Sequence, residues 1–153
     1  MTVRFERRTI VGATPDVVYA RSLDVDFHQA SFAESDERPV GGVRHGEMRL
    51  GDVVTWRARH LGRWWEMTTV ISETDPPHRF VDEQHDGPFA SFVHEHTFQP
   101  LGDDWTEMWD HVEFVAPLGI LGRIAETAVL RWYLPRLIDI RNEALANEFT
   151  ARQ

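Results

Sequence analysis

The stretch that most constrains the fold is residues 117–149, which carries the pattern of one long helix near the C-terminus. Apolar side chains recur there at three- and four-residue spacings and predict a stripe on one helical face: Leu121, Ile124, Ala125, Ala128 and Trp132. Pro135 lies inside the run and removes a backbone donor, so we expect a bend there. Beyond it the apolar positions are rotated by roughly a third of a turn: Leu134, Ile138, Leu145 and Phe149. Such a helix needs a surface to cover, and its two halves are expected to contact different parts of that surface.

The chain before this helix is predicted to form mostly β-strands. Short apolar runs bounded by glycine, proline and aspartate predict strands at Val3–Val11, Val40–Arg44, Val53–His60, Arg63–Ser72, Arg79–His85, Phe89–Gln99 and Trp105–Val115. Two short helices are expected after the first strand, because Thr14-Pro15-Asp16 is a strong helix start and Asp24 can cap a second helix. Short turns between consecutive strands favour an antiparallel sheet. The fold class is therefore α+β, a curved antiparallel sheet of six to seven strands wrapped around a long C-terminal helix from about Gly119 to Phe149.

Length and composition exclude several classes of function. A chain of 153 residues, 42% of them hydrophobic, fits one domain spanning residues 1–153. It contains no cysteine, which rules out disulfides and thiolate chemistry, and no apolar run near the roughly 20 residues of a membrane span, so we expect a cytoplasmic protein. The net charge is −9 and the 16 basic residues are scattered among acidic ones. We therefore expect no nucleic-acid partner and repulsion from anionic lipid.

Several short motifs occur in an order that resembles a known superfamily. They are Gly51-Asp52 before Trp56, Pro77 before Phe80-Val81-Asp82-Glu83-Gln84, Gly87-Pro88-Phe89, His94-Glu95-His96-Thr97-Phe98, Asp110-His111-Val112-Glu113-Phe114, Pro117-Leu118-Gly119 with Gly122, and Arg141. In this order the chain resembles the helix-grip proteins of the START-like (SRPBCC) superfamily, especially their bacterial ligand-binding and polyketide cyclase/dehydratase-like branch. The similarity runs from Phe5 to Phe149.

The resemblance implies an elongated pocket between the sheet and the C-terminal helix, which in such proteins usually holds an apolar or aromatic small molecule. It brings no match to a known catalytic centre. From the faces on which they are expected to lie, the candidate ligand-binding residues are Trp56, Met67, Phe80, Asp82, Gln84, Phe92, His94, His96, Asp110, Phe114, Ile124, Ala128, Trp132 and Arg141. If there is catalysis, His94 and Asp110 are the candidates.

The histidines are the main chemical signal, since five of the eight lie between positions 78 and 111. His94 and His96 share a strand face with Phe92 and Phe98. Two histidines so spaced can reach one metal ion, with Asp82, Gln84 or Asp110 completing the site. The alternative is a buried hydrogen-bond network, which we favour because no compact third-ligand motif is present. We expect neither a metal nor another cofactor.

The carboxylates on the same face need partners, because a lone charge on an apolar face costs several kcal/mol. Histidine is the available partner for Asp82 and Asp110. Such a pair either transfers protons and orients a ligand or fixes strand register as a structural bond. Arg141 falls on the apolar stripe of the helix, where its stem can pack while its head binds a carboxylate or an anionic ligand group.

Three functions remain open from the sequence. The first is a carrier for a hydrophobic or aromatic small molecule, as a monomer or homodimer. The second is a cofactor-independent enzyme of the cyclase/dehydratase type, with a pocket histidine and carboxylate as acid and base. The third is a protein-interaction module resembling a co-chaperone. Carrier and enzyme both need an apolar cavity with a few convergent polar groups, so the sequence does not separate them.

Overall fold

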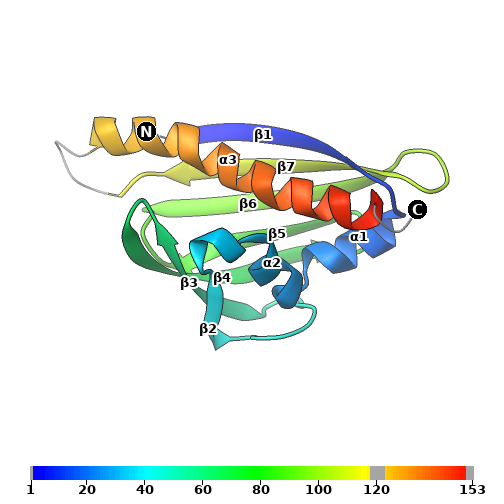
Figure 1. Cartoon of the computed structure of the whole chain (residues 1–153), viewed down its shortest axis with the longest axis horizontal. Helices are drawn as coiled ribbons and strands as arrows, with labels where there is room; N and C mark the ends of the chain where they lie inside the picture. The colour runs from blue at the N-terminus through cyan, green and yellow to red at the C-terminus, as the bar shows by residue number, and fades with distance from the viewer. Residues whose placement is uncertain (1, 118–122, 151–153) are drawn as a thin grey trace.

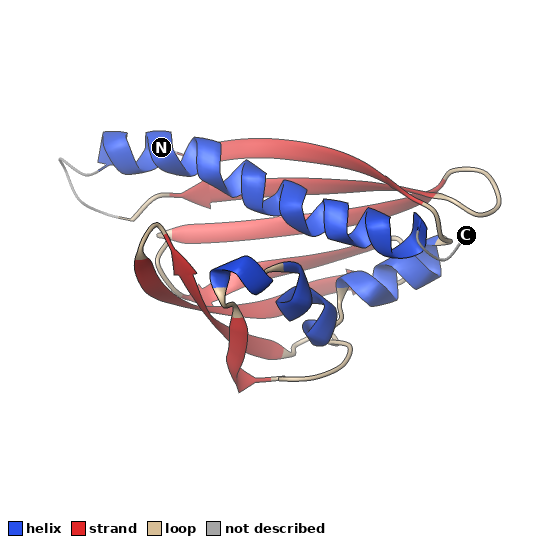
Figure 2. Cartoon of the chain, viewed as in Figure 1, coloured by secondary structure: helices blue, strands red, loops and turns tan. Residues whose placement is uncertain are grey.

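A computed structural model describes residues 2–117 and 123–150, with the side chains of 123–126 not described. Seven strands form one antiparallel sheet in the order β1-β7-β6-β5-β4-β3-β2. The strands are β1 (Thr2–Val11), β2 (Arg38–Gly42), β3 (Val53–His60), β4 (Arg63–Asp75), β5 (Arg79–Asp86), β6 (Ser91–Pro100) and β7 (Thr106–Val115). The sheet curves around the long helix α3 (Arg123–Thr150), as Figures 1 and 2 show. The predicted helix-grip fold is confirmed.

The curvature has a local cause in the strand pairing. The register between β4 and β5 shifts twice, near Thr68 and near Ser72, and the register between β2 and β3 shifts near Val40. Such bulges increase the twist of a strand and bend it. The outer strands therefore fold over toward α3 and give the sheet a concave face.

Two short helices follow β1, as predicted, and cover one end of the concave face. Helix α1 (Pro15–Ser22) has proline at its first position, and α2 (Val25–Ser31) is capped by Asp24, whose carboxylate accepts the Phe27 N–H at 2.8 Å. A short 3₁₀ turn, η1 (Ala33–Ser35), leads on to β2. Val18, Tyr19, Val25 and Phe27 are buried, so both helices contribute to the core.

Helix α3 is continuous through Pro135; the inward face of its second half is the predicted one, but that of its first half differs. The observed inward stripe runs at three- and four-residue steps without changing face: Thr127, Leu130, Leu134, Ile138, Arg141, Leu145 and Phe149. Ala128 is exposed and Trp132 is 66% exposed, so the expectation that they face the sheet is wrong. The predicted position of Arg141 is confirmed, since its stem lies on the inward stripe and its guanidinium binds the buried carboxylate of Asp110. The bend at Pro135 stays a prediction, and Leu121 lies outside the described residues.

The apolar core consists of two clusters. The larger lies under α1, α2 and the end of α3, and includes Val18, Phe80, Phe98 and Leu145. The smaller lies under the first half of α3, where Val112 and Phe114 pack with Phe92, Leu130, Leu134 and Ile138. Strands β6 and β7 each place residues in both clusters. On β6, His94 lies between Phe92 of the smaller cluster and Phe98 of the larger, and on β7, Asp110 lies between Met108 of the larger and Val112 of the smaller. This boundary is the place to look for chemistry.

Candidate functional site

Two histidines and two aspartates on neighbouring strands form crossed pairs on the concave face. In the strand register His94 lies opposite Asp82 of β5, and His96 lies opposite Asp110 of β7. The hydrogen bonds instead run diagonally: His94 Nε2 lies 2.7 Å from Asp110 Oδ1, and His96 Nε2 lies 2.7 Å from Asp82 Oδ2. The two imidazoles stack at 3.7 Å between ring centroids where the pairs cross. Each ring is thereby fixed in orientation.

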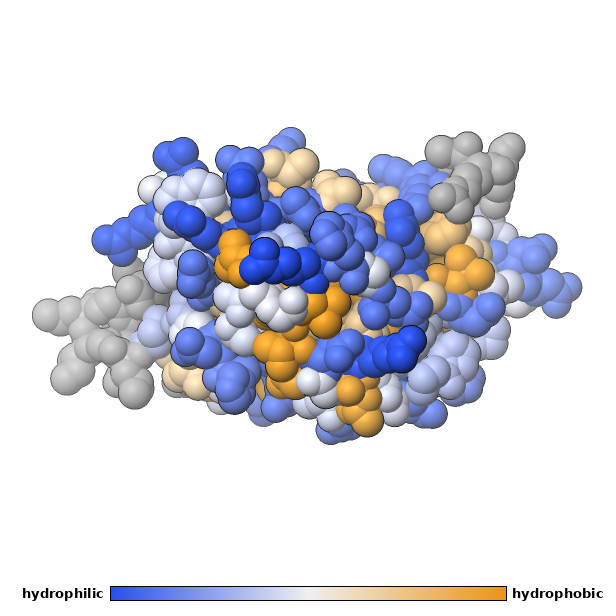
Figure 3. Space-filling view, turned by 90° about the horizontal axis from the view of Figure 1, so that it is seen from below, coloured by the Kyte–Doolittle hydropathy of each residue, from blue (hydrophilic) through white to orange (hydrophobic). Residues whose placement is uncertain are grey.

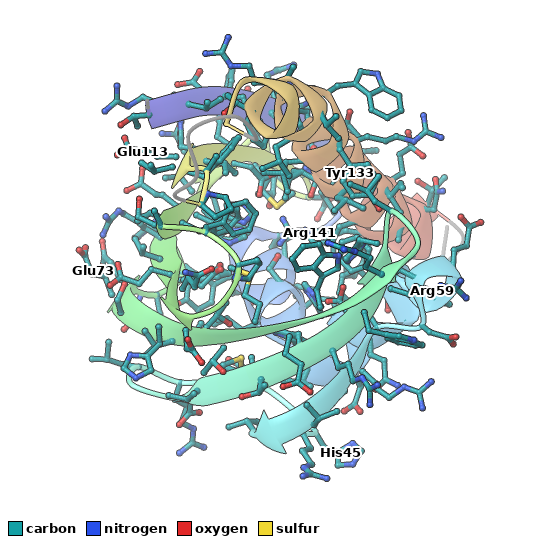
Figure 4. The ribbon with its side chains drawn as sticks, turned by 90° about the vertical axis from the view of Figure 1, so that its left-hand side faces the viewer. His45, Arg59, Glu73, Glu113, Tyr133 and Arg141 are labelled. Carbon is teal, nitrogen blue, oxygen red and sulfur yellow. The ribbon has the colours of Figure 1, made fainter. Side chains whose placement is uncertain are left out.

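Helix α3 supplies the remaining polar groups. Arg141 Nη2 donates to Asp110 Oδ1 at 2.8 Å, and Asn142 Nδ2 donates to Asp110 Oδ2 at 2.6 Å. Arg141 also donates to the side-chain oxygen of Asn142 and approaches His96 Nδ1 at 3.4 Å. Asp110, which is fully buried, therefore receives donors from both the sheet and the helix. Figure 4 shows Arg141 inside the concave face, beneath α3.

Burial and charge set the protonation of this cluster. Burial would raise the pKa of Asp110, but Arg141 and the hydrogen bonds from the histidines hold that pKa well below its usual value. Burial also opposes ionisation of Asp82, yet the hydrogen bond with His96 lowers its pKa. Burial lowers the pKa of His94 to about 4, with His96 acting in the same direction and Asp110 opposing. His94 is therefore neutral at pH 7, with both carboxyls ionised.

A neutral His94 can have only one proton arrangement here. The carboxylate of Asp110 is an acceptor, so the ring proton must lie on Nε2. Nδ1 then carries a lone pair, and within the described part of the chain no residue donates a hydrogen bond to it. Nδ1 of His94 is thus an acceptor of fixed direction, because Nε2 of the same ring is held by the fully buried Asp110. His96 Nε2 likewise lies on a carboxylate, that of Asp82, while its Nδ1 lies 3.4 Å from Arg141 Nη1 and 3.3 Å from Asp110 Oδ1.

The structure brings most of the predicted site residues together. Asp82, His94, His96, Asp110 and Arg141 form the polar cluster, and Phe80 stacks on His96 with 4.1 Å between ring centroids. Phe92 and Phe114 lie in the adjacent apolar cluster. Gln84 has a structural role, because its amide both donates to and accepts from the backbone of Phe89 and so closes the turn between β5 and β6.

Other predicted residues lie apart from this cluster. The ring of Trp56 lies against that of His28 of α2 in a tilted arrangement, with 4.3 Å between ring centroids, and Met67 is the cross-strand neighbour of Trp56. Ala128 and Trp132 point away from the sheet, and the side chain of Ile124 lies outside the described residues. A surface depression of about 470 Å³ near α1 contains none of the predicted binding residues; its lining includes Tyr19, Leu23, Met48 and Pro77. The internal cavity itself stays a prediction.

Sequence reasoning missed Asn142 and a second polar cluster. Asn142 could have been found, since it lies four residues after Ile138 and three before Leu145, on the buried stripe. In the second cluster, His28 Nε2 lies 2.6 Å from Glu37 Oε1, and His60 Nδ1 lies 2.9 Å from the Tyr133 hydroxyl. Glu37 also lies 3.9 Å from His60 Nε2. These residues come from four separate segments, and no sequence spacing connects them.

The metal hypothesis rests on Asp82, His94 and His96, whose potential ligand atoms lie within 4.8 Å of one another. Their geometry is that of a hydrogen-bond network, with the two Nε2 atoms on carboxylates and Nδ1 of His96 directed at Arg141. A cation bound here would meet the guanidinium of Arg141 and displace short hydrogen bonds. The arrangement therefore favours the network over an ion.

A family profile described as polyketide cyclase / dehydrase and lipid transport matches residues 2–150. The chain belongs to this family. The match covers nearly the whole chain and agrees with the START-like (SRPBCC) assignment. No curated protein sequence matches.

Solved structures with the family fold are similar over nearly their full length. The Zhui aromatase/cyclase from Streptomyces sp. R1128 has a TM-score of 0.73 at 18% identity, covering 99% of this chain and 96% of that one. A START superfamily protein from Mycobacterium smegmatis has a TM-score of 0.74 at 12% identity, covering 98% and 99%. The Staphylococcus aureus protein SA2116 has a TM-score of 0.75 at 12% identity, covering 100% and 98%. At these identities the similarity shows the fold alone.

Proposed function

We propose that the protein binds a small apolar or aromatic molecule between the sheet and α3, with a hydroxyl group of that molecule donating to Nδ1 of His94. The observation that carries the proposal is the oriented, partner-free acceptor beside an apolar cluster. No fully buried side-chain nitrogen or oxygen among the described residues lacks a partner, so Nδ1 keeps accessible surface, at which a ligand hydroxyl can supply the missing donor. The family's polyketide cyclase and lipid-transport description is consistent with such a ligand.

The apolar side chains near His94 support a space for that ligand. Phe92 of β6 and Leu130, Leu134 and Ile138 of α3 face the interior but are only partly buried, whereas neighbouring Phe114 is completely covered. Inward side chains that keep accessible surface indicate incomplete filling of the space between sheet and helix. These residues would form the apolar wall, with His94 at its polar end.

The charge of the cluster indicates which ligands it would accept. Asp82 and Asp110 are ionised, Arg141 supplies one positive charge, and His94 is neutral. Among these four groups, the two carboxylates and the one guanidinium leave one net negative charge. A carboxylate or phosphate at His94 would meet this charge and find no donor, because Nδ1 only accepts. A phenol or alcohol fits both conditions.

A cofactor-independent enzyme of the cyclase type is the second candidate, favoured by the His94–Asp110 pair. A histidine held by a carboxylate can take a proton from a substrate hydroxyl or from a carbon next to a carbonyl. The pKa of about 4, however, makes His94 a weak base at pH 7. Binding therefore comes first, and catalysis would need the substrate itself to raise this pKa.

Displacement of an environment-sensitive apolar dye, followed with a panel of phenols and matched non-hydroxylated aromatics, tests the proposal. We expect phenols to compete better. His94→Gln should weaken the phenols by about tenfold, the effect of one lost hydrogen bond, and should leave the non-hydroxylated compounds unchanged. His111→Gln is the matched control, since His111 lies on the outer face of β7 and binds Glu6.

A second pair of variants tests the location of the ligand. Leu134→Trp adds a large group on the inward side of α3 and should reduce binding, whereas Ala128→Trp adds the same group on the exposed side and should not. Equal effects of the two variants, or no preference for phenols, would contradict the proposal. Turnover lost in His94→Gln with retained binding would establish the enzyme instead.

A further inference from the structure

Exposed tryptophan and leucine side chains gather where the β3–β4 hairpin meets α3. Leu61 is 57% exposed, Trp64 47% and Trp132 66%, and every residue from 61 to 66 at the hairpin tip is exposed. Together with two exposed arginines they form what we call the rim: Leu61, Arg63, Trp64, Trp65, Trp132 and Arg136. Large exposed apolar side chains grouped at one place mark a surface for interaction.

A direct contact joins the two parts of the rim. His60, at the end of β3, forms the hydrogen bond with Tyr133 of α3, and Tyr133 directly follows Trp132. Arg136 lies one turn further along the helix. Figure 1 shows the hairpin tip and the first half of α3 at the same end of the molecule, and Figure 4 shows the labelled Tyr133 and Arg59 on the same side of that end.

This end is locally positive, although the protein carries a net charge of −9. Residues 53–65 and 127–138 contain no aspartate or glutamate, yet they hold Arg57, Arg59, Arg63, Arg131 and Arg136. Several arginines elsewhere are paired with carboxylates, as in Arg8–Glu107 and Arg79–Glu73. Within the described parts of the chain, Arg63 and Arg136 form no such pair. The fold therefore brings two acid-free segments together, with Glu66 opposite Arg57 in the hairpin and Glu37 at 3.9 Å from His60 as the neighbouring acids.

The backbone at the tip also points to a function for Leu61. Leu61 and Gly62 both have positive φ, 52° and 75°, in a two-residue turn where asparagine and glycine are favoured. Leucine is strained in this region, and it gains no burial there in return. In addition, Arg57 lies over the Trp64 ring at 4.9 Å and holds that indole on the outer face. The tip thus presents apolar groups at a cost to stability.

We propose that the rim docks the protein on an anionic lipid surface. Surfaces that bind the interface of such a membrane combine tryptophan and leucine with arginine. The indoles lie at the level of the headgroups, and the guanidinium groups bind the lipid phosphates. The exposed apolar side chains distinguish the rim from a surface that binds a nucleic-acid backbone through charge alone. Binding would be peripheral, because no described helix is long and apolar enough to cross a bilayer.

Flotation with vesicles tests docking on the intact protein. We expect binding to vesicles of phosphatidylcholine and phosphatidylglycerol at 7:3 in low salt, weaker binding in 0.5 M salt, and little binding to phosphatidylcholine alone. Arg63→Gln/Arg136→Gln and Trp64→Ala/Trp132→Ala should each lower the partition coefficient at least fivefold. These side chains are exposed, so the variants should fold, and thermal melting checks this.

Matched controls lie away from the rim. Trp105 is an exposed tryptophan beside the β6–β7 turn, and Arg44 and Arg49 lie between β2 and β3. Trp105→Ala and Arg44→Gln/Arg49→Gln should bind vesicles like the wild type. Loss of vesicle binding in these controls, or no binding by the wild type, would overturn the proposal. So would a dimer that dissociates in Trp64→Ala/Trp132→Ala, or binding of polyuridylate without binding of vesicles.

Discussion

Replacing Asp110 by Asn should destabilise the protein more than any other single charge change in the sheet. Asp110 is fully buried and accepts from His94, Arg141 and Asn142. An amide removes the negative charge and turns one acceptor into a donor facing other donors. Arg141 would remain buried without a counter-charge, and breaking a buried pair in this way costs about 3–5 kcal/mol. Domains of this kind unfold with about 5–15 kcal/mol, so the loss is a large part of the total.

Urea unfolding followed by circular dichroism measures this loss. The control is Glu113→Gln on the same strand, because its pair with Arg4 is exposed and should change the free energy of unfolding by less than about 1 kcal/mol. Asp110→Asn combined with Arg141→Met should cost less than the two single changes added together, since neither charge is then left alone. A loss below about 1 kcal/mol for Asp110→Asn, or strict additivity, would refute the account of the cluster.

Three further predictions follow from other contacts. The pKa of His94 falls from about 6.5 in the unfolded chain to about 4 in the folded protein, so about 3 kcal/mol of the free energy of unfolding is present above pH 6.5 and is lost as the pH falls to 4. Urea unfolding between these pH values should show a steeper decline in the free energy of unfolding for the wild type than for His94→Gln. Tyr133→Phe should cost about 1 kcal/mol for the hydrogen bond to His60, whereas Tyr19→Phe should cost little, because the Tyr19 hydroxyl has no hydrogen bond in the described chain; equal losses would argue against this. Leu61→Asn should raise the melting temperature by relieving the turn and weaken vesicle binding, and a lower melting temperature would show that the turn is unstrained.

The sheet was predictable because each strand carries its own evidence. Alternation places Phe92, His94, His96 and Phe98 on one face, and the fold needs that face inward, so the side chains follow once the strand is known. The predicted β3 has the observed bounds, and most other ends differ by one to three residues. The crossing of the Asp–His pairs was not predictable, because strand register gives only the directly opposite residue.

Hydrophobicity predicted the inward face of the second half of α3, but not that of the first half, because the buried side chains on the helix are partly polar. By hydropathy alone, an inward stripe that includes Trp132 fits the sequence. The hydrogen bonds to Asp110, however, place both Arg141 and Asn142 on the inward side of the helix. Placing these two residues inward rotates the helix, and Ala128 and Trp132 then turn to solvent. The buried carboxylate of Asp110 thus acts together with the apolar side chains Leu134, Ile138 and Leu145 in fixing which side of α3 faces the sheet.

The rotation of α3 that places Arg141 inside the protein also determines which of its side chains are exposed at the rim. Hydropathy alone does not reveal the rim, since tryptophan and arginine both rank below the aliphatic residues, and the face in Figure 3 shows apolar groups scattered among polar ones. Trp132 is part of the rim because it faces solvent on α3, the helix whose Arg141 binds the buried Asp110. If the cluster were replaced by apolar residues of similar size, α3 would lose the contacts that fix its rotation. Such a variant could remain folded and still present Trp132 differently, so vesicle binding would report on a buried hydrogen-bond network.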